Sequence, residues 1–441
     1  MKDSGMVWIG CVPEQWKRYR LRYLCEMKTG GTPEDKYGIN DDGEGYPWIT
    51  APDINETYRI SSYSQYINDK AIKQCNYKLF PPNSTLLVCI ASVGKLGLIE
   101  EYCYANQQIT ALIPNQFVEP EFLMYYIQAM SVKIIDDASS NVVPIINSQY
   151  LKNICVFIPD LLEQKRITAF INKRVVLTNS ILSDLQKQIE ILDNYKKSLI
   201  TEIVTKGLNP NAPMKDSGVE WIGDVSATNE IIKLKYYSYM KGRIGWQGLN
   251  SEDFIDEGPY CVTGTDFVNG SINWKSCYHV SEERYNMDPN IQLRVGDLLV
   301  TKDGTIGKLA MIKELPEKAC LNSHLLIIRP LKDVYINEYL YYVMLSDMFS
   351  TYYRLVSTGS TMDSLSQEKM GNFQFPIHSI EEQKNIVDYL DDKCQRIDEI
   401  IQNKSVQITK LEDYKQSLIF EYVTGKKRVK EAMEWLSKAD S

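Results

Sequence analysis

The sequence predicts an α+β protein with a pseudo-twofold internal repeat, in which two mixed, mainly β domains are separated by two long antiparallel coiled-coil helices. Two repeats predict this organisation. A long amphipathic segment in the middle of the chain returns near the C-terminus, so that Glu163-Gln164-Lys165 recurs as Glu382-Gln383-Lys384, at a shift of 219 residues. The segment 1–10, MKDSGMVWIG, returns as MKDSGVEWIG at 214–223, a shift of 213 residues.

The repeated amphipathic segment predicts a long helix in each half. The first copy starts with Asp160 and Glu163 at capping-box spacing, and the second starts with Ser379 and Glu382. Apolar side chains then follow at alternating spacings of three and four, which is typical of a coiled-coil seam. About 40 residues at 1.5 Å each give a helix of roughly 60 Å. Since such a helix needs a partner for its seam, we expect the two copies to pair with each other. The predicted seam consists of Leu182, Leu185, Ile189, Leu192, Leu199, Ile203, Ile401, Ile408, Leu411, Leu418 and Tyr422.

The repeats divide the chain into four parts. Residues 1–159 form the first domain, 160–213 the central helix and linker, 214–377 the second domain, and 378–441 the C-terminal helix with a basic tail. Inside the domains, short apolar runs punctuated by Gly, Pro, Asn and Asp indicate strands. One short helix is expected in each domain, at 121–129 and 337–345, and the basic tail is expected to be a short or frayed terminal helix.

Composition places the chain among ordinary globular proteins. Hydrophobic residues make up 44% and charged residues 24%. No apolar run approaches the ~18 residues of a membrane span, and the start of the chain lacks a signal-peptide apolar region. The ten cysteines are scattered without a CxxC motif, which favours reduced, mostly buried thiols and a cytoplasmic location. The net charge of −8 does not by itself indicate a nucleic-acid binder, because binding depends on a local basic surface.

Catalytic motifs are weak or missing in the sequence. Gly304–Lys308 (GTIGK) lacks the spacing of a P-loop. Asp160, Glu163 and Lys165 imitate a PD…ExK nuclease site, but helix capping explains the first two better, and Ser379 replaces the aspartate in the second copy. With three histidines, a histidine-based catalytic triad or metal cluster is not indicated. These features predict a binding protein with no metal and no catalytic residue of its own.

The loops inside the domains carry the features of a nucleic-acid interface. Lysines in loops rich in Gly, Ser and Thr suit phosphate contacts, and loop amides suit adenine edges. The two halves differ at these loops: KTGGTP at 28–33 corresponds to KGRIGW at 241–246, and SVGKLG at 92–97 to DGTIGK at 303–308. Taken alone, each lysine is better explained as a solvated surface charge, and each pair of loop amides by turn chemistry. The predicted DNA-binding residues are Lys28, Thr29, Gly30, Thr32, Ser92, Lys95, Gln107, Gln108, Lys241, Arg243, Lys302, Asp303, Thr305, Lys308, Asn322 and Ser323.

Taken together, these motifs resemble the specificity (S) subunit of type I restriction–modification enzymes. The resemblance rests on the repeated MKDSG..WIG, the repeated EQK.I and the repeated helix end YK.SLI.E.VT, which is followed by Gly207 in the first copy and by Gly425 in the second. These motifs occur twice in the same order and span nearly the whole chain. The first copy departs from the motif at Met6-Val7, and the second has Asn229 where the first has Trp16.

The resemblance implies that each domain is a target-recognition domain that reads one half of a bipartite DNA site. The paired helices would set the spacer between the half-sites and help to dock two modification subunits. Those subunits would use S-adenosylmethionine to methylate adenine at N6. Restriction subunits would add ATP- and Mg²⁺-dependent translocation and cleavage, so this chain itself would bind no cofactor. Because the loops of the two halves differ, the half-sites are expected to differ as well.

Two other classes remain open on the residues alone. A non-catalytic coiled-coil scaffold that binds protein or glycan is compatible with the acidic total and the missing catalytic motifs. A fused methyltransferase or nuclease is disfavoured, because its motifs are absent from the sequence.

Overall fold

A computed structural model describes residues 1–32, 38–41, 43–55, 58–69, 71–72, 78–138, 143–243, 249, 251–357 and 364–429. The chain forms two compact units, each built from one β-rich domain and one end of each long helix. Unit 1 comprises Met1–Gln186 and Ser405–Ser441, and unit 2 comprises Lys187–Lys404. The predicted outer part of the basic tail, from residue 430 onward, lies outside the described residues.

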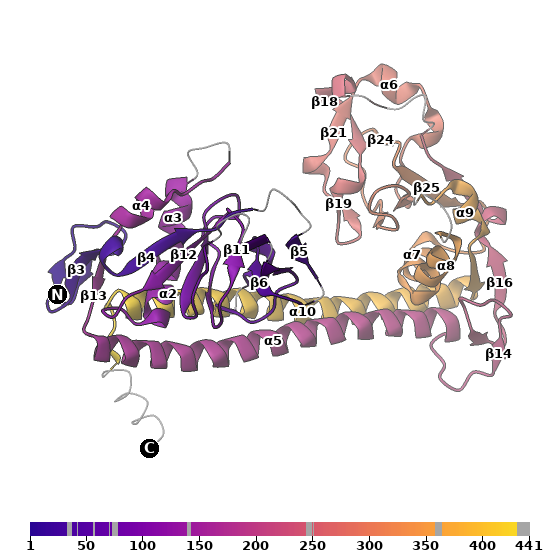
Figure 1. Cartoon of the computed structure of the whole chain (residues 1–441). Helices are drawn as coiled ribbons and strands as arrows, with labels where there is room; N and C mark the ends of the chain where they lie inside the picture. Colours follow the sequence, from indigo (N-terminus) through magenta and orange to yellow (C-terminus); the bar gives the residue numbers. More distant parts are fainter. Residues whose placement is uncertain are drawn as a thin grey trace. The chain divides into compact units, whose positions relative to one another are not determined.

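Unit 1 is organised around a five-stranded sheet in the order β4-β12-β9-β10-β7 (Figure 1). The first four strands in this order, β4, β12, β9 and β10, pair antiparallel with their neighbours. Their inward residues contribute to the main core of the unit. Helix α2 packs on this sheet, on the side that faces α5. The bounds are β4 Cys25–Thr29, β12 Ile109–Pro114, β9 Ser84–Val88, β10 Leu96–Ile99, β7 Arg59–Ile60 and α2 Pro120–Ala129.

Unit 2 repeats this arrangement with other residues. Its antiparallel sheet has the order β17-β25-β22-β23, and α7 packs on the sheet as α2 does in unit 1. The predicted short helices at 121–129 and 337–345 are therefore confirmed, the first starting one residue earlier. The bounds are β17 Ser238–Lys241, β25 Leu325–Pro330, β22 Leu298–Thr301, β23 Leu309–Met311 and α7 Asn337–Leu345.

Each unit carries a second, smaller sheet beside the first. In unit 1 its order is β11-β6-β8-β5, and in unit 2 it is β21-β18-β24. Two-stranded pairs join the start of each domain to its end: β3 with β13, and β16 with β26. Their bounds are as follows: β11 Tyr104–Ala105, β6 Tyr46–Ile49, β8 Tyr66–Ile67, β5 Ile39–Asn40, β21 Tyr278–Val280, β18 Phe254–Val262, β24 Ala319–Leu321, β3 Lys17–Arg20, β13 Cys155–Ile158, β16 Glu230–Lys233 and β26 Gln374–Ile377.

Short helices and hairpins complete the units. The repeated segments at the start of each half form small antiparallel hairpins, β1 with β2 and β14 with β15. Their bounds, with those of the remaining helices and the β19–β20 hairpin, are β1 Lys2–Asp3, β2 Cys11–Val12, β14 Met214–Asp216, β15 Asp224–Ser226, α3 Ser131–Ala138, α4 Ser148–Asn153, β19 Phe267–Val268, β20 Ser271–Ile272, α6 Glu282–Asn286, α8 Asp347–Ser357 and α9 Gln367–Asn372.

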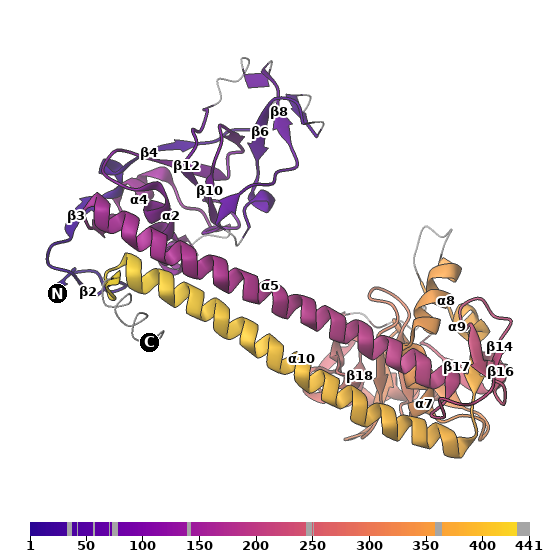
Figure 2. The ribbon, with the colours of Figure 1, turned by 90° about the horizontal axis from the view of Figure 1, so that it is seen from below.

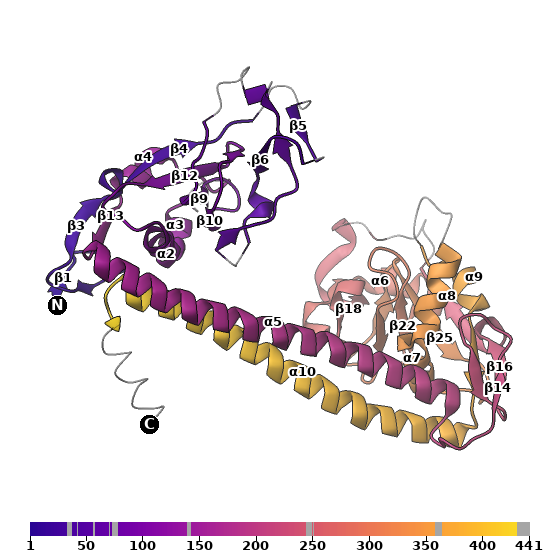
Figure 3. The ribbon, with the colours of Figure 1, turned by 60° about the horizontal axis from the view of Figure 1, so that its bottom comes forward.

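The two long helices are α5, Leu161–Lys206, and α10, Ile380–Val423. Within each unit they lie side by side and run in opposite directions (Figures 2 and 3). In unit 2, Lys196 Nζ donates to Asp398 Oδ1 at 2.6 Å across the pair. The repeat-related contact in unit 1 joins Lys415 Nζ to Asn179 Oδ1 at 3.2 Å. The side chains that were predicted to form the seam are half-buried or buried along both helices.

The repeated Glu-Gln-Lys motif holds each long helix to its own domain. The side chains of Gln164 and Gln383 are fully buried. Gln164 Oε1 accepts from Glu119 N at 2.8 Å, at the start of α2, and Gln383 Oε1 accepts from Ile336 N at 3.0 Å, at the start of α7. One glutamine in each copy therefore caps the short helix of its domain. The predicted N-caps are also present, since Glu163 N donates to Asp160 Oδ1 and Glu382 N donates to Ser379 Oγ.

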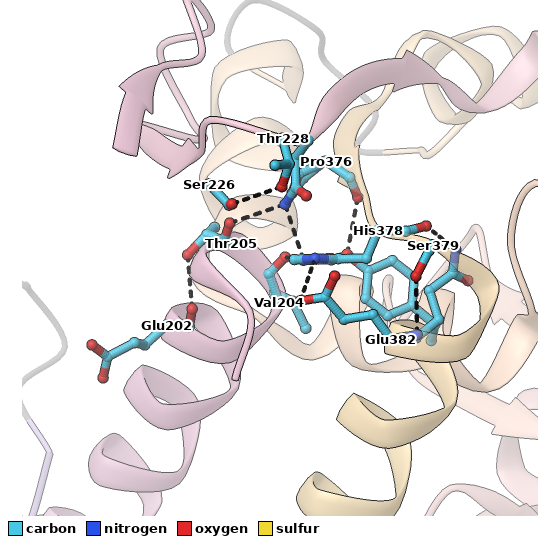
Figure 4. Close-up of polar contacts among 12 residues, drawn as sticks. Glu202, Val204, Thr205, Ser226, Thr228, Pro376, His378, Ser379 and Glu382 are labelled. Atoms are coloured by element: carbon cyan, nitrogen blue, oxygen red, sulfur yellow. Dashed lines mark hydrogen bonds and ion pairs between the residues drawn. The ribbon is translucent and has the colours of Figure 1, made fainter. Parts of the chain in front are cut away.

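The C-terminal end of α5 is held by a polar cluster in unit 2 (Figure 4). Val204 O receives the hydroxyl of Tyr339 at 3.1 Å and lies 3.0 Å from Nε2 of the buried His378. Asn229 Nδ2 lies 3.1 Å from the same histidine nitrogen. Tyr339 and His378 thus reach a carbonyl that the helix end leaves without a backbone partner, and Asn229 Nδ2 donates to the next carbonyl, Thr205 O, at 3.4 Å. In unit 1, Trp16 stands at the position of Asn229 and Pro159 at that of His378. The apolar pair of unit 1 is thus replaced by a hydrogen-bonded pair in unit 2.

The cysteines of the described part of the chain are free thiols, and seven of these nine are buried. Burial raises the pKa of Cys25 and Cys103 to about 12. The expectation of reduced, mostly buried thiols agrees with this arrangement. No helix in the described residues is long and apolar enough to cross a membrane.

Candidate nucleic-acid interface

One edge of the main sheet in unit 1 gathers the predicted DNA-binding residues of that unit. Because β4, β12, β9 and β10 alternate in direction, the end of β4, the start of β12, the end of β9 and the start of β10 all meet at this edge. The loops 30–32, 89–95 and 106–108 leave the sheet there. We call these three loops, with the sheet ends that carry them, the loop edge of unit 1.

Backbone hydrogen bonds join the three loops into one surface. Gly30 N donates to Ile109 O at 2.9 Å, and Gly31 N donates to Ala105 O at 3.1 Å. Cys89 N donates to Gln108 O at 2.7 Å. A Cβ at position 30 would lie 2.2 Å from Ala105 O, so the first loop can approach the third this closely only with glycine.

The predicted side chains of unit 1 differ in their exposure and in whether other side chains already bond to them. Ser92, Lys95 and Gln107 are exposed, and Gln107 Oε1 accepts from the hydroxyl of Thr32. Thr29 is bonded to Thr110, with their hydroxyl oxygens 3.1 Å apart. Other contacts occupy Lys28, which pairs with Glu26 at 3.5 Å, and Gln108, whose Oε1 accepts from Asn106 Nδ2.

Unit 2 presents the equivalent edge at the ends of β17, β25, β22 and β23. Its loops are 242–243, 302–308 and 322–324, and we call this surface the loop edge of unit 2. Thr301 organises the middle loop, because its hydroxyl donates to Thr305 O at 2.5 Å and accepts from Lys308 N at 2.9 Å. Thr305 and Lys308 are exposed, and Lys241 is half-buried at the end of β17.

The polar side chains of this edge already interact with one another. Lys302 Nζ lies 3.1 Å from Asp303 Oδ2, and His324 Nδ1 lies 3.5 Å from the same oxygen. Asn322 Oδ1 accepts from the Ser323 hydroxyl at 3.0 Å, which leaves the amide nitrogen of Asn322 to act as a donor.

Arg243, which was predicted to bind DNA, is buried in the structure. Its side chain is 4% exposed, and its guanidinium donates to Leu321 O at 3.1 Å and to Cys320 Sγ at 3.4 Å. These contacts tie the end of β17 to β24. Sequence reasoning assigned Arg243 to the surface because it sits in a Gly-bearing loop, and the loop turns this side chain inward.

One pair of elements at the loop edges was missed from the sequence. Thr50–Asp53 and Thr263–Asp266 are short hydrogen-bonded turns in which the Thr and Asp are the same in both halves. They occur 213 residues apart, which is also the shift between the repeated start segments. Aligning the two halves at that shift would therefore have identified them.

The residues that imitate a nuclease site make structural contacts in the described part of the chain. No group of three or more His, Cys, Asp or Glu there is arranged to hold a metal ion. Asp160 accepts from Glu163 N at 2.9 Å, and Glu163 lies 3.7 Å from Arg428 Nη1, so the PD…ExK residues serve helix capping and an ion pair. Burial raises the pKa of the Cys89 thiol, which lies at the start of the 89–95 loop.

Known proteins place the chain in one family. The model of the type I restriction modification DNA specificity domain matches residues 13–191 and 247–410. The MjaVIII specificity subunit of Methanocaldococcus jannaschii is 22% identical over 426 residues, which cover 95% of this chain and 94% of the relative. The EcoR124I/EcoR124II specificity subunit of Escherichia coli is 30% identical over 184 residues, which cover 40% of this chain and 45% of the relative.

A solved structure shows the same fold. It belongs to a study of complex assembly and conformational transition of the type I R-M system, and it matches with a TM-score of 0.69 at 16% identity, covering 94% of this chain and 98% of the other. The family model matches well over half of the chain and does so in both halves. The chain therefore belongs to the family of type I restriction–modification specificity subunits, which recognise DNA and have no catalytic activity of their own.

Proposed function

We propose that each unit reads one half of an asymmetric bipartite DNA site through its loop edge. The observation that carries this proposal is the pair of matched edges. The same strand ends carry the loops in both units, while the side chains in those loops differ. A shared framework with different loop residues suits two surfaces that recognise different base sequences.

Exposed lysines at the two edges supply the phosphate contacts in this proposal. Lys95 in unit 1 and Lys308 in unit 2 both follow a glycine with positive φ, Gly94 and Gly307. A lysine that neutralises one phosphate releases about one counterion, so its removal lowers the salt slope of binding by about one. The amides of Gln107 and Asn322 suit contacts to adenine.

The long helices act as the spacer between the half-sites in this proposal. Each is one uninterrupted helix, with 46 residues in α5 and 44 in α10. A continuous helix of this length resists bending, so the two half-sites are recognised only at a fixed separation. Breaking either helix should therefore relax the spacing requirement while each half-site remains recognised.

Two modification subunits dock on the helices and the start segments, and they methylate adenine N6 with S-adenosylmethionine. Restriction subunits that use ATP and Mg²⁺ join the assembly, which acts on double-stranded DNA in the cytoplasm. Support for docking comes from large apolar side chains that are exposed on α5: Leu162 is 60% exposed, Val176 69% and Ile191 65%. Large apolar side chains that are exposed at intervals along α5 offer contact area to a partner.

The docking part of the proposal is tested by changing one exposed apolar residue. Val176→Asp should weaken assembly with the modification subunit, measured as the fraction of chain in the complex on size-exclusion chromatography. Val268→Asp is the matched control, because Val268 is exposed but lies in β19, outside the helices. Equal assembly of both variants with the wild-type chain would contradict docking at this part of α5.

The DNA part of the proposal is tested with the assembled methyltransferase complex. Lys95→Ala and Lys308→Ala should each lower DNA affinity at every sequence to a similar degree. Unchanged affinity and an unchanged salt slope in both variants would contradict phosphate binding at the loop edges.

A further inference from the structure

The turns Thr50–Asp53 and Thr263–Asp266 share one frame. In both, the first residue is Thr and the fourth is Asp. Asp53 Oδ2 accepts from Thr50 N at 2.8 Å and from Thr50 Oγ1 at 2.6 Å. Asp266 Oδ2 accepts from Thr263 N and Thr263 Oγ1, both at 2.8 Å. Hydrogen bonds to a carboxylate are about twice as strong as neutral ones, so the Asp side chain fixes the shape of its turn.

The second turn is held from outside as well. Asp266 Oδ1 accepts from the Ser276 hydroxyl at 2.8 Å, and the Asp266 side chain is 1% exposed. A buried carboxylate is costly unless its oxygens are bonded, and here both oxygens have partners. The turn is thus a rigid element, in contrast to an ordinary surface loop.

Both turns sit directly against the loop edges. The residue before each turn accepts a backbone hydrogen bond from the third loop: Asn106 N donates to Ile49 O at 3.2 Å, and Asn322 N donates to Val262 O at 2.9 Å. In unit 2 a Cβ at Gly264 would lie 2.9 Å from Thr301 Cγ2. Since Thr301 holds the 302–308 loop, the turn touches two of the three loops that form the edge.

The two residues inside the frame differ between the units. Unit 1 has Ala51-Pro52 and unit 2 has Gly264-Thr265. Pro52 and Thr265 are exposed at the tips of their turns. The Thr265 hydroxyl oxygen lies 2.7 Å from that of Thr263, so it has a fixed direction, whereas Pro52 offers only an apolar ring. A constant frame with a variable, exposed tip is the arrangement expected of a residue that distinguishes bases.

We propose that these turns are specificity-determining elements, in which Asp53 and Asp266 are positioning residues and Pro52 and Thr265 contact base edges of the two half-sites. The proposal rests on the proposed function, because it takes the loop edges as the DNA-binding surfaces. Hydroxyl and methyl groups of threonine can both meet base edges in the major groove, and a proline ring suits contact with a thymine methyl group. The chemistry of the two tips therefore predicts different base preferences.

The test measures base preference with the assembled methyltransferase complex on a library randomised in both half-sites. Thr265→Val removes the hydroxyl and keeps the shape, and it should change the preference at one or two base pairs of one half-site by about tenfold. Thr265→Ser keeps the hydroxyl and should preserve the preference for bases that it contacts. Asp266→Asn should relax preferences in the same half-site, while Asp53→Asn should relax those of the other half-site.

A purely structural turn gives a different result. If Thr265→Val leaves all base preferences within about twofold of wild type, and Asp266→Asn lowers methylation equally for every sequence, the proposal is overturned. Pro52→Ala carries the same test in unit 1, should Thr265→Val not assemble. Lys308→Ala, measured in parallel, distinguishes failure of DNA binding at the loop edge from failure of base recognition by the turn. A normal salt slope in that variant would refute the loop edge itself, whereas a reduced slope with an inert Thr265→Val would refute only the turn.

Discussion

Replacing Leu192 with proline tests whether the long helices fix the spacing of the half-sites. Leu192 lies within α5 and is half-buried. Proline at this position removes the helix hydrogen bond from the residue 192 N–H to Gln188 O, and its ring clashes with that carbonyl. The cost to the helix is about 3 kcal/mol or more.

The matched control is Leu192→Ala, which removes apolar contact and keeps the helix. A fully buried Leu→Ala change costs about 2–5 kcal/mol, and this half-buried site should cost roughly half of that. Leu411→Pro is the repeat-related change in α10 and should act as Leu192→Pro does. Circular dichroism and thermal unfolding check that the domains of each variant remain folded.

The assay compares methylation of sites with the native spacing and with spacings one to three base pairs longer or shorter. The wild-type complex and Leu192→Ala should prefer the native spacing strongly. Leu192→Pro should bring the ratio of native to altered spacing toward one, because a broken helix no longer holds a fixed separation. A Leu192→Pro complex that kept the wild-type ratio would refute the spacer model.

Three further changes probe separate parts of the structure. Lys95→Ala should lower the salt slope of DNA binding by about one. The control Lys78→Ala changes an exposed lysine outside the loop edge and should leave the slope unchanged. Equal slopes in the two variants would count against Lys95 as a phosphate contact. Arg243→Ala should lower the unfolding temperature, because it leaves Leu321 O without its buried partner. A variant of unchanged stability that binds DNA more weakly would instead indicate that Arg243 contacts DNA. Burial raises the pKa of Cys103 to about 12, so at pH 8 this thiol should resist iodoacetamide. The exposed Cys11 should react under the same conditions. Fast labelling of Cys103 in the native chain would contradict its burial.

Much of the fold was predictable because both repeats follow simple physical patterns. The heptad spacing from Leu182 to Ile203 specifies a helix with one apolar seam, and the caps at Asp160 and Ser379 specify where the helices begin. The repeated Glu-Gln-Lys motif was visible as a repeat, but its role was not. Gln164 acts by accepting from a backbone N–H of a distant segment, and nothing local in the sequence indicates that partner.

The candidate site was predicted less completely, for a related reason. Loop composition pointed to residues such as Lys95 and Lys308, and the structure places both in exposed positions at the sheet edges. Composition cannot tell which way a loop side chain turns, so Arg243 was placed at the surface although it bonds to the backbone of a buried strand. The Thr-x-x-Asp turns escaped notice because each looks like an ordinary turn until both copies are compared in the register of the start segments.

Sequencing of methylated DNA determines whether two unlike loop edges read two unlike half-sites. The measurement maps N6-methyladenine in cells that carry this chain with its modification partner and in cells that lack the chain. We expect one chain-dependent motif made of two different short sequences, separated by a fixed number of unspecified base pairs, with one methylated adenine in each half. A palindromic motif, or one uninterrupted sequence without a spacer, would contradict it.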